Sequence, residues 1–161
     1  MKQFAPVTFC FLFILLVFAS SACADGYAWG KTKWGMSPEQ VSKALGEKIV
    51  FAKKNEKGED VHILKGHKIG EFQYDVRMVF NAKKLNMVMI MGTGDSTSKK
   101  KACLDMAGSL RERLGRAYVI TMGDAVSREW RTSESNISLM CFPDETWLSY
   151  EKKPNPGASK F

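Results

Sequence analysis

The sequence predicts an α+β fold, with mainly antiparallel sheet and one short and one long helix packed on one face of it. Two observations support this class. Segments in which apolar and polar residues alternate, as they do in strands, surround two segments with the three- and four-residue spacing of a helix. The order of short helix, several strands, long helix and several strands is typical of antiparallel sheets with helices on one face. The same order also fits two helix-plus-strands halves related by an internal repeat.

The first predicted element is a helix over residues 38–45, within the segment WGMSPEQVSKALG. Ser37 at the N-cap and Gln40 three residues later form the pattern of a capping box, and proline suits the first helical position. Gly46 is a typical residue at which a helix ends. The apolar face of this helix is narrow, which favours docking on a sheet.

Four strands are predicted between the two helices. Residues 72–81 alternate between apolar and polar side chains, so one face of this strand must be buried. Residues 85–91 are apolar on both faces, which indicates a central strand covered on both sides or a strand that faces a partner. The other two strands are residues 48–53 and 61–64, and the segment GHKIG at residues 66–70 is predicted to break the chain after them.

The long helix is predicted over residues 98–114, where apolar residues recur at three- and four-residue steps before Gly115. Four further strands are predicted after it, at residues 117–122, 126–132, 136–142 and 146–151. Residues 152–161, KKPNPGASKF, are predicted to form a disordered tail.

Residues 1–24 are predicted to be a secretory signal peptide. Lys2 precedes an apolar run over residues 9–18, and small residues follow up to Ala24. The run is shorter than the roughly 20 residues that cross a bilayer, and we predict no transmembrane segment in the mature chain. Cleavage after Ala24 leaves a single α+β domain over residues 25–151, in a periplasmic or secreted protein. The alternative is a lipoprotein anchored through Cys23.

The chain is basic, with a formal net charge of +7 at pH 7. Removal of the signal peptide takes away one lysine and leaves 23 basic and 17 acidic side chains, a net charge of +6. Such an excess favours an anionic surface as partner, such as a lipid headgroup or another polyanion. Nucleic acid is not expected as a partner outside the cytoplasm.

Two cysteines, Cys103 and Cys141, follow the predicted cleavage point. Cys103 lies on the apolar stripe of the long helix, and Cys141 shares a strand face with Ile137 and Leu139. Both thiols therefore point into the layer between helix and sheet. Cysteines in an oxidising compartment usually pair, so we predict a disulfide bond. The alternative is two reduced, buried cysteines that pack as small hydrophobic side chains.

The segment MIMGTGDSTSKKK predicts an anion-binding site. A strand ends in glycines, hydroxyl side chains follow, and three lysines stand where a helix begins and its amide groups are free. The predicted anion-binding residues are Gly92, Gly94, Ser96, Thr97, Ser98, Lys99, Lys100 and Lys101. The alternative is a polar loop followed by a solvated lysine run.

His62 and His67 are the two histidines of the chain, and acidic residues stand near them. A zinc site needs three or four converging ligands, but His67 is predicted to lie in the turn after Gly66, away from His62 on its strand. We therefore predict exposed histidines, with neither a metal nor another cofactor. The chain also lacks the Gly-x-Ser-x-Gly motif of many serine hydrolases.

Seven methionines fall on predicted strands or on the long helix. We predict that they fill the core, and the alternatives are an adaptable peptide-binding surface or a soft metal site for copper. These residues are Met78, Met87, Met89, Met91, Met106, Met122 and Met140.

The start of the short helix resembles a known motif. Its residues resemble the Gly-Met-Thr-x-x-Gln-Val motif, with Leu-Gly a few residues later, of small bacterial envelope proteins of the SmpA/OmlA (BamE) type. They are Gly35, Met36, Ser37, Gln40, Val41, Leu45 and Gly46. The chain also resembles small exported bacterial envelope proteins of unknown function that begin with a WGxS segment and end in a Trp-containing hairpin and a short strand ending in Tyr, here Trp130 and Tyr150. Both resemblances imply a location in the cell envelope.

These observations predict a non-enzymatic envelope binding or protein-interaction domain, with an envelope protein or an anionic surface as its partner. Trp34, just before the capped helix, is predicted to pack under that helix, and the alternative is an exposed aromatic anchor for a partner. The alternative function is a small secreted hydrolase or a metal-dependent enzyme that uses His62 or His67.

Overall fold

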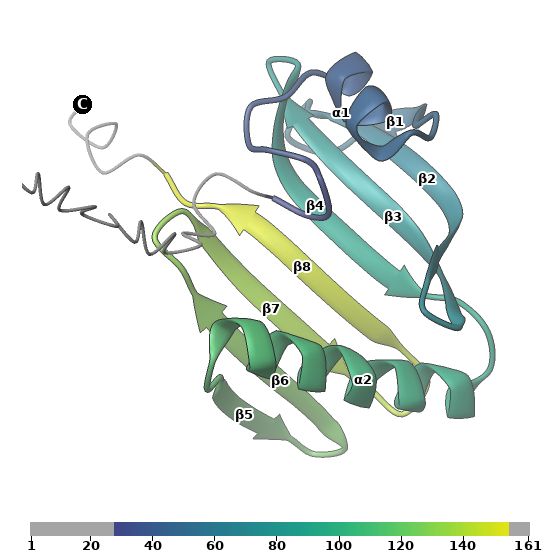
Figure 1. Ribbon diagram of the computed structural model, residues 1–161, viewed down its shortest axis with the longest axis vertical. Coiled ribbons are helices and arrows are strands. Elements are labelled where there is room, and N and C mark those ends of the chain that lie inside the picture. Colours follow the sequence, from purple (N-terminus) through teal and green to yellow (C-terminus); the bar gives the residue numbers. More distant parts are fainter. Residues whose placement is uncertain (1–27, 155–161) are drawn as a thin grey trace, which may run out of the picture.

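The computed structural model describes residues 28–154, which form two helices and eight strands (Figure 1). The helices are α1 (Pro38–Leu45) and α2 (Ser96–Leu114). The strands are β1 (Val50–Lys54), β2 (Asp60–Ile69), β3 (Phe72–Asn81), β4 (Lys84–Gly92), β5 (Tyr118–Met122), β6 (Ala125–Arg131), β7 (Ser135–Cys141) and β8 (Thr146–Lys152). The predicted signal peptide and residues 155–161 of the predicted tail lie outside the described residues.

The eight strands form one antiparallel sheet in the order β1-β2-β3-β4-β8-β7-β6-β5. Each helix precedes a four-stranded meander, and the two meanders meet at the centre of the sheet, where Ile90 of β4 pairs with Leu148 of β8. The predicted α+β class is confirmed, and the described sheet is wholly antiparallel rather than mainly so. An internal repeat that relates the two halves stays a prediction.

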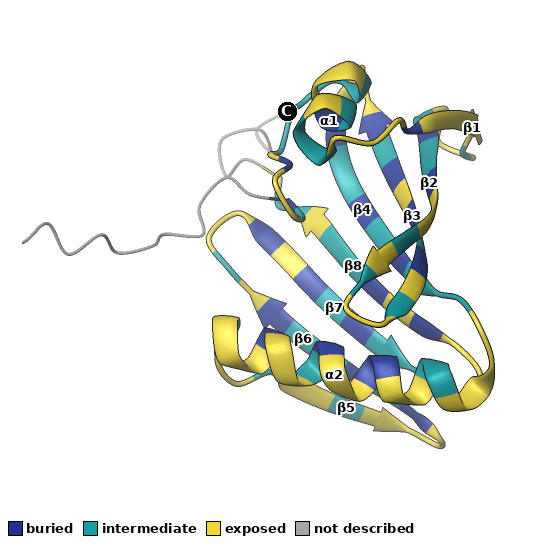
Figure 2. Cartoon of the chain, turned by 45° about the vertical axis from the view of Figure 1, so that its right-hand side comes forward, coloured by how far each residue is buried: buried dark blue, intermediate teal, exposed yellow. Residues whose placement is uncertain are grey.

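The core lies between the sheet and the two helices. Every second residue of β3 from Tyr74 to Phe80 is buried, and the residues between them are more exposed (Figure 2). Val41 of α1 and Leu110 of α2 belong to the same buried cluster as these β3 residues. Both helices therefore cover one face of the sheet. Neither helix is long and apolar enough to cross a membrane.

Cys103 and Cys141 form the predicted disulfide bond. Cys103 is buried on α2, Cys141 is the last residue of β7, and their Cα atoms are 6.0 Å apart. The bond joins two residues that are 38 positions apart in sequence. It therefore ties the long helix to the second half of the sheet.

The helix α1 begins and ends at the predicted residues. The Ser37 hydroxyl accepts the N–H of Gln40 at 3.3 Å, and the Gln40 side chain accepts the N–H of Ser37 at 2.9 Å. At the other end Gly46 has a φ of +72°, in the left-handed region that glycine adopts without strain. Both caps of this short helix are thus encoded by residues next to it.

We expect Ser37→Ala to lower the free energy of unfolding by about 1 kcal/mol, because the N–H of Gln40 loses its acceptor. Thermal unfolding followed by circular dichroism measures this change. Ser37→Thr keeps a hydroxyl acceptor and is the matched control, with a smaller expected loss. An alanine variant as stable as the wild-type protein would contradict a stabilising role for this cap.

The strand β2 is longer than predicted. The segment 66–70 is predicted to break the chain, but β2 continues through Gly66 to Ile69. The pairing of β2 with β3 shifts register just before His67, and Gly66 lies in this bulge with a φ of +63° and donates its N–H to Asp75 Oδ1 at 3.0 Å. The glycine bends the strand instead of ending it. The prediction that His67 lies in a turn is therefore wrong.

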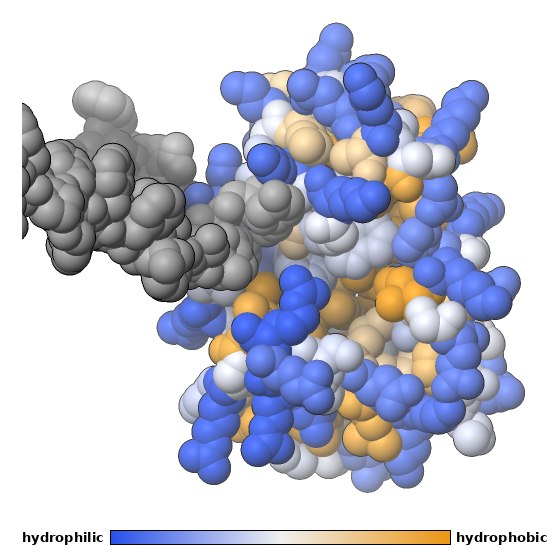
Figure 3. Space-filling view, in the orientation of Figure 1, coloured by the Kyte–Doolittle hydropathy of each residue, from blue (hydrophilic) through white to orange (hydrophobic). Residues whose placement is uncertain are grey.

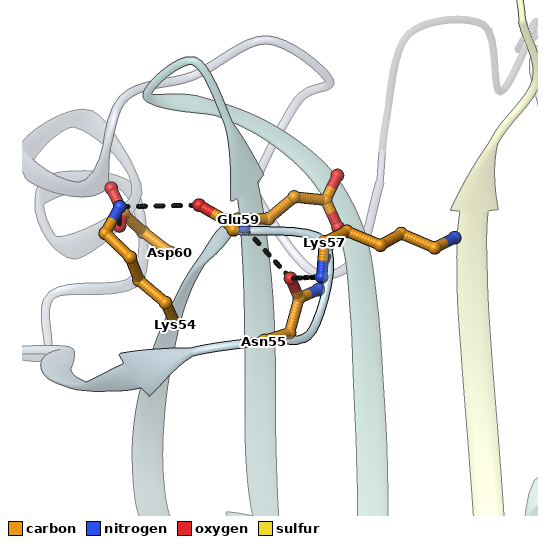
Figure 4. Close-up of polar contacts among 6 residues, drawn as sticks. Lys54, Asn55, Lys57, Glu59 and Asp60 are labelled. Carbon is orange, nitrogen blue, oxygen red and sulfur yellow. Dashed lines mark hydrogen bonds and ion pairs between the residues drawn. The ribbon is translucent and has the colours of Figure 1, made fainter.

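Side chains fix the turn between β1 and β2 (Figure 4). The Asn55 side-chain oxygen accepts the N–H of Lys57 at 3.0 Å and the N–H of Glu59 at 2.9 Å. Below the turn, Lys54 and Asp60 form an ion pair at 2.8 Å. These contacts explain why the polar run NEKGED joins the two strands in a closed hairpin.

The methionines are divided between the two faces of the sheet. Met78 and Met106 are buried in the core, as predicted. Met122 is exposed, and four other methionines are half-buried on the face opposite the helices, so the prediction of core filling is wrong for these five. The four are Met87, Met89, Met91 and Met140. The reason is that α1 and α2 leave this face of the sheet uncovered.

Candidate functional site

A cleft of about 660 Å³ opens on the helix-bearing face of the sheet. Its walls are α2 on one side and residues 28–30 with the β2–β3 turn on the other, and strands β3, β4, β8 and β7 supply its floor. In Figure 3, apolar side chains gather across the middle of this face and hydrophilic side chains surround them. The fold therefore assembles the cleft from segments far apart in the sequence.

The floor of the cleft is apolar. Ile90, Leu148 and Ile137 come from the neighbouring strands β4, β8 and β7, and all three are buried. Met106 and Leu110 of α2 add an apolar wall above them. A surface of this kind suits the apolar body of a ligand, because water leaves both surfaces on contact.

Tyr74 and Asp105 lie together along the cleft lining. Tyr74 is only 2% exposed. Burial, and secondly the negative charge of Asp105, raise the pKa of Tyr74 to about 12. The hydroxyl therefore stays protonated at neutral pH and can donate a hydrogen bond.

Tyr150 and Arg113 form a second polar pair in the lining. Burial raises the pKa of Tyr150, and the positive charge of Arg113 opposes this rise. Arg113 is exposed and takes part in no ion pair among the described residues. A helix rises about 1.5 Å per residue, so Asp105 and Arg113 are roughly 12 Å apart along α2. The cleft thus has an acidic end and a basic end.

Trp34 lies outside the cleft lining but is hydrogen-bonded to one of its residues. Its indole N–H donates to the Ser135 hydroxyl at 3.0 Å, and Ser135 is 3% exposed and belongs to the cleft lining. The indole itself is half-buried and packs against the core. A role of Trp34 in binding a partner stays a prediction.

The predicted anion-binding segment lies at the N-terminus of α2, and none of its eight residues lines the cleft. Asp95, which the sequence analysis overlooked, is the N-cap and accepts the N–H of Ser98 at 2.7 Å. An acidic side chain therefore lies where the anion was predicted. Lys101 forms an ion pair with Glu71 and lies 5.5 Å from the centre of the Phe72 ring. Anion binding by this segment stays a prediction.

Neither histidine lines the cleft. His62 lies between two phenylalanine rings at 5.0 and 5.6 Å, and its buried Nδ1 has no hydrogen-bond partner within the described part of the chain. Burial lowers the pKa of His62, which is therefore neutral at pH 7. His67 Nδ1 lies 2.7 Å from the Glu47 carboxylate, and its ring packs edge-on against Trp29. Both histidines are half-buried, so the prediction that they are exposed is wrong.

The described residues hold neither a grouped set of metal ligands nor a free thiol in the cleft. Within residues 28–154, no three histidine, cysteine, aspartate or glutamate side chains are grouped so that they could hold a metal ion. Cys103 and Cys141 are joined in the disulfide bond, so neither is a thiolate nucleophile. The lining supplies an apolar floor, the hydroxyls of two tyrosines and charges of both signs.

Four polar residues of the cleft lining were not predicted as site residues from the sequence, namely Tyr74, Asp105, Arg113 and Tyr150. Tyr74 shares its strand face with Val76, Met78 and Phe80, and Tyr150 follows the buried Leu148 on the same face of β8. Only the need of a hydroxyl for a partner distinguishes the two tyrosines from core residues. Asp105 and Arg113 flank the apolar stripe of α2 and look like ordinary surface charges. The strand order and the packing of α2 on the sheet place all four in the lining of one cleft.

Comparison of the chain with protein-family models, with curated proteins and with solved structures finds no significant match.

Proposed function

We propose that this protein is a non-enzymatic binding domain of the cell envelope, and that it holds an amphipathic ligand with an acidic group in the cleft. The single observation that carries this proposal is Arg113, an arginine without an ion-pair partner among the described residues, at the margin of an apolar floor. Export, with cleavage after Ala24 and a periplasmic or secreted destination, belongs to the same proposal.

The size of the cleft suits a small molecule. Ligand sites commonly enclose about 300–1,000 Å³ and combine apolar walls with a few polar groups that fix orientation. The volume of about 660 Å³ and the floor of Ile90, Leu148 and Ile137 agree with this pattern. The apolar body of the ligand would therefore lie along the floor, parallel to α2.

The charges give the ligand a direction. An acidic group is attracted by Arg113 and can accept a hydrogen bond from the neighbouring Tyr150 hydroxyl. Asp105 repels the same group at the other end of the cleft. The ligand class that fits best is thus a hydrocarbon or similar apolar body with a carboxylate or phosphate at one end, directed toward Arg113.

A catalytic role finds less support. Tyr74, with a pKa of about 12, is a hydrogen-bond donor and not a base at neutral pH. The hydrolase or metal-dependent alternative relies on His62 or His67, but both lie outside the cleft lining and pack against aromatic rings. We therefore retain binding as the proposed function.

Calorimetric titration with decanoate tests this proposal. We expect the wild-type protein to bind decanoate, and Arg113→Gln to weaken binding about tenfold or more because a charge-assisted hydrogen bond is lost. Arg111→Gln is the matched control, since Arg111 is an exposed arginine on the same helix that does not line the cleft. The uncharged analogue 1-decanol should bind the Arg113→Gln and Arg111→Gln variants with equal affinity.

Two outcomes would contradict the proposal. If decanoate does not bind the wild-type protein, the proposed class of ligand, an apolar body with one acidic group, is wrong. Equal affinities of the Arg113→Gln and Arg111→Gln variants for decanoate would remove the role of Arg113 and, with it, the orientation of the ligand.

A further inference from the structure

The two edge strands of the sheet, β1 and β5, differ in how well they are protected against pairing with another strand. The β1 edge has a bulge between Phe51 and Lys53 and ends in two lysines, and both features hinder the addition of another strand. The β5 edge, with the sequence YVITM, has an unbroken register with β6 and contains no charged residue, proline or glycine. Only the β5 edge is therefore open to a further strand.

Three of the five side chains of β5 are large and apolar or aromatic, yet they are exposed. Tyr118 is 69% exposed, Val119 53% and Met122 52%. Such a strand at a sheet edge offers both backbone groups and apolar side chains to a partner. The helix α2 contacts β7 and β8, so it leaves the outer side of β5 clear (Figure 1).

The hairpin geometry identifies the backbone groups that point outward. Met122 pairs with Ala125 across a two-residue loop that begins with Gly123 at a φ of +60°. The pair beside such a loop exchanges both of its hydrogen bonds with the opposite strand, and every second pair along the ladder does the same. Tyr118, Ile120 and Met122 therefore direct their N–H and C=O groups toward β6. The N–H and C=O groups of the intervening residues, Val119 and Thr121, point away from β6.

We propose that β5 pairs with β5 of a second copy of this chain, antiparallel and centred on Ile120. In this register Val119 of one copy lies opposite Thr121 of the other, so all the outward-pointing groups of both strands form hydrogen bonds. Tyr118 lies opposite Met122, which brings their exposed side chains together. The two sheets become one continuous sheet with a two-fold axis at Ile120.

The charges beside β5 complement each other in the same register. Arg116 lies two residues before β5 and Asp124 lies in the loop directly after it, so in this register the arginine of one copy faces the loop that carries the aspartate of the other. Both are exposed, and neither forms an ion pair with another described residue. A two-fold dimer therefore gains two equivalent ion pairs at the ends of the paired strands.

This dimer should be weak and reversible. A pair of five-residue strands buries much less than the roughly 1,200–2,000 Å² of a stable interface. Sedimentation equilibrium of the mature wild-type protein, from about 10 μM to about 1 mM, should therefore show a monomer–dimer equilibrium within that range.

Three variants test the register. Arg116→Asp should weaken dimerisation about tenfold or more, because two attractions become repulsions, and the double variant Arg116→Asp/Asp124→Arg should restore it. Thr121→Pro removes an N–H that points away from β6, so it should abolish the dimer while circular dichroism remains that of the wild type. Val50→Lys on the β1 edge is the control and should dimerise normally.

A wild-type protein that stays monomeric at the highest concentration would overturn the proposal. So would a dimer that both Arg116→Asp and Thr121→Pro leave unchanged, because its interface would then lie elsewhere. If Thr121→Pro fails to fold, the charge reversal and its restoration still decide the question.

Discussion

Replacing both cysteines, Cys103→Ala with Cys141→Ala, lowers the expected free energy of unfolding by about 3–4 kcal/mol. The bond closes a loop between residues 38 positions apart, and opening it returns conformational freedom to the unfolded chain. Cys103 is also buried, so its truncation removes some packing. For a domain of this size the midpoint of thermal unfolding should fall by roughly 10 °C or more.

Reduction provides the control for this prediction. A thiol reductant should lower the midpoint of the wild-type protein by a similar amount and leave the double variant unchanged. A double variant that melts within about 2 °C of the oxidised wild-type protein would contradict a stabilising role of the disulfide bond.

Trp34→Ala has the second-largest expected effect, a loss of about 2–3 kcal/mol in the free energy of unfolding. The half-buried indole packs against the core and donates a hydrogen bond to Ser135, which is 101 positions away in the sequence. The substitution removes this packing and leaves the buried Ser135 hydroxyl without its donor. Chemical denaturation measures the loss.

Trp34→Phe separates the two contributions. It keeps most of the packing and removes only the hydrogen bond, so we expect a loss of about 1 kcal/mol. If Trp34 instead anchors a partner, Trp34→Ala will unfold like the wild-type protein but no longer capture that partner. This outcome would overturn the scaffold role.

The sequence predicted best what neighbouring residues determine. The bounds of α1 follow from Ser37, Gln40 and Gly46, which act within one turn of the helix ends. The pairing of Cys103 with Cys141 followed from the face on which each lies, because the periods of helix and strand settle that locally.

Features that depend on distant neighbours were missed. Gly66 looked like a strand end, but its N–H bonds to Asp75 of the next strand and the strand continues past the bulge. The polar ends of the cleft were also missed, because Tyr74 and Arg113 line one cleft only through the strand order and the packing of α2 on the sheet, which no local pattern encodes. Whether residues 92–101 bind an anion stays a prediction.

The position of β8 has a consequence for the order in which the protein can fold. This strand is the last of the eight in sequence, yet it lies at the centre of the sheet between β4 and β7. Its pairing of Met87 with Glu151 joins the middle of the described range to its C-terminal end, and such distant contacts form slowly. Until β8 pairs with it, β4 is an unpaired edge of the first meander. The two halves of the sheet therefore become one structure only when almost all of the domain has been made.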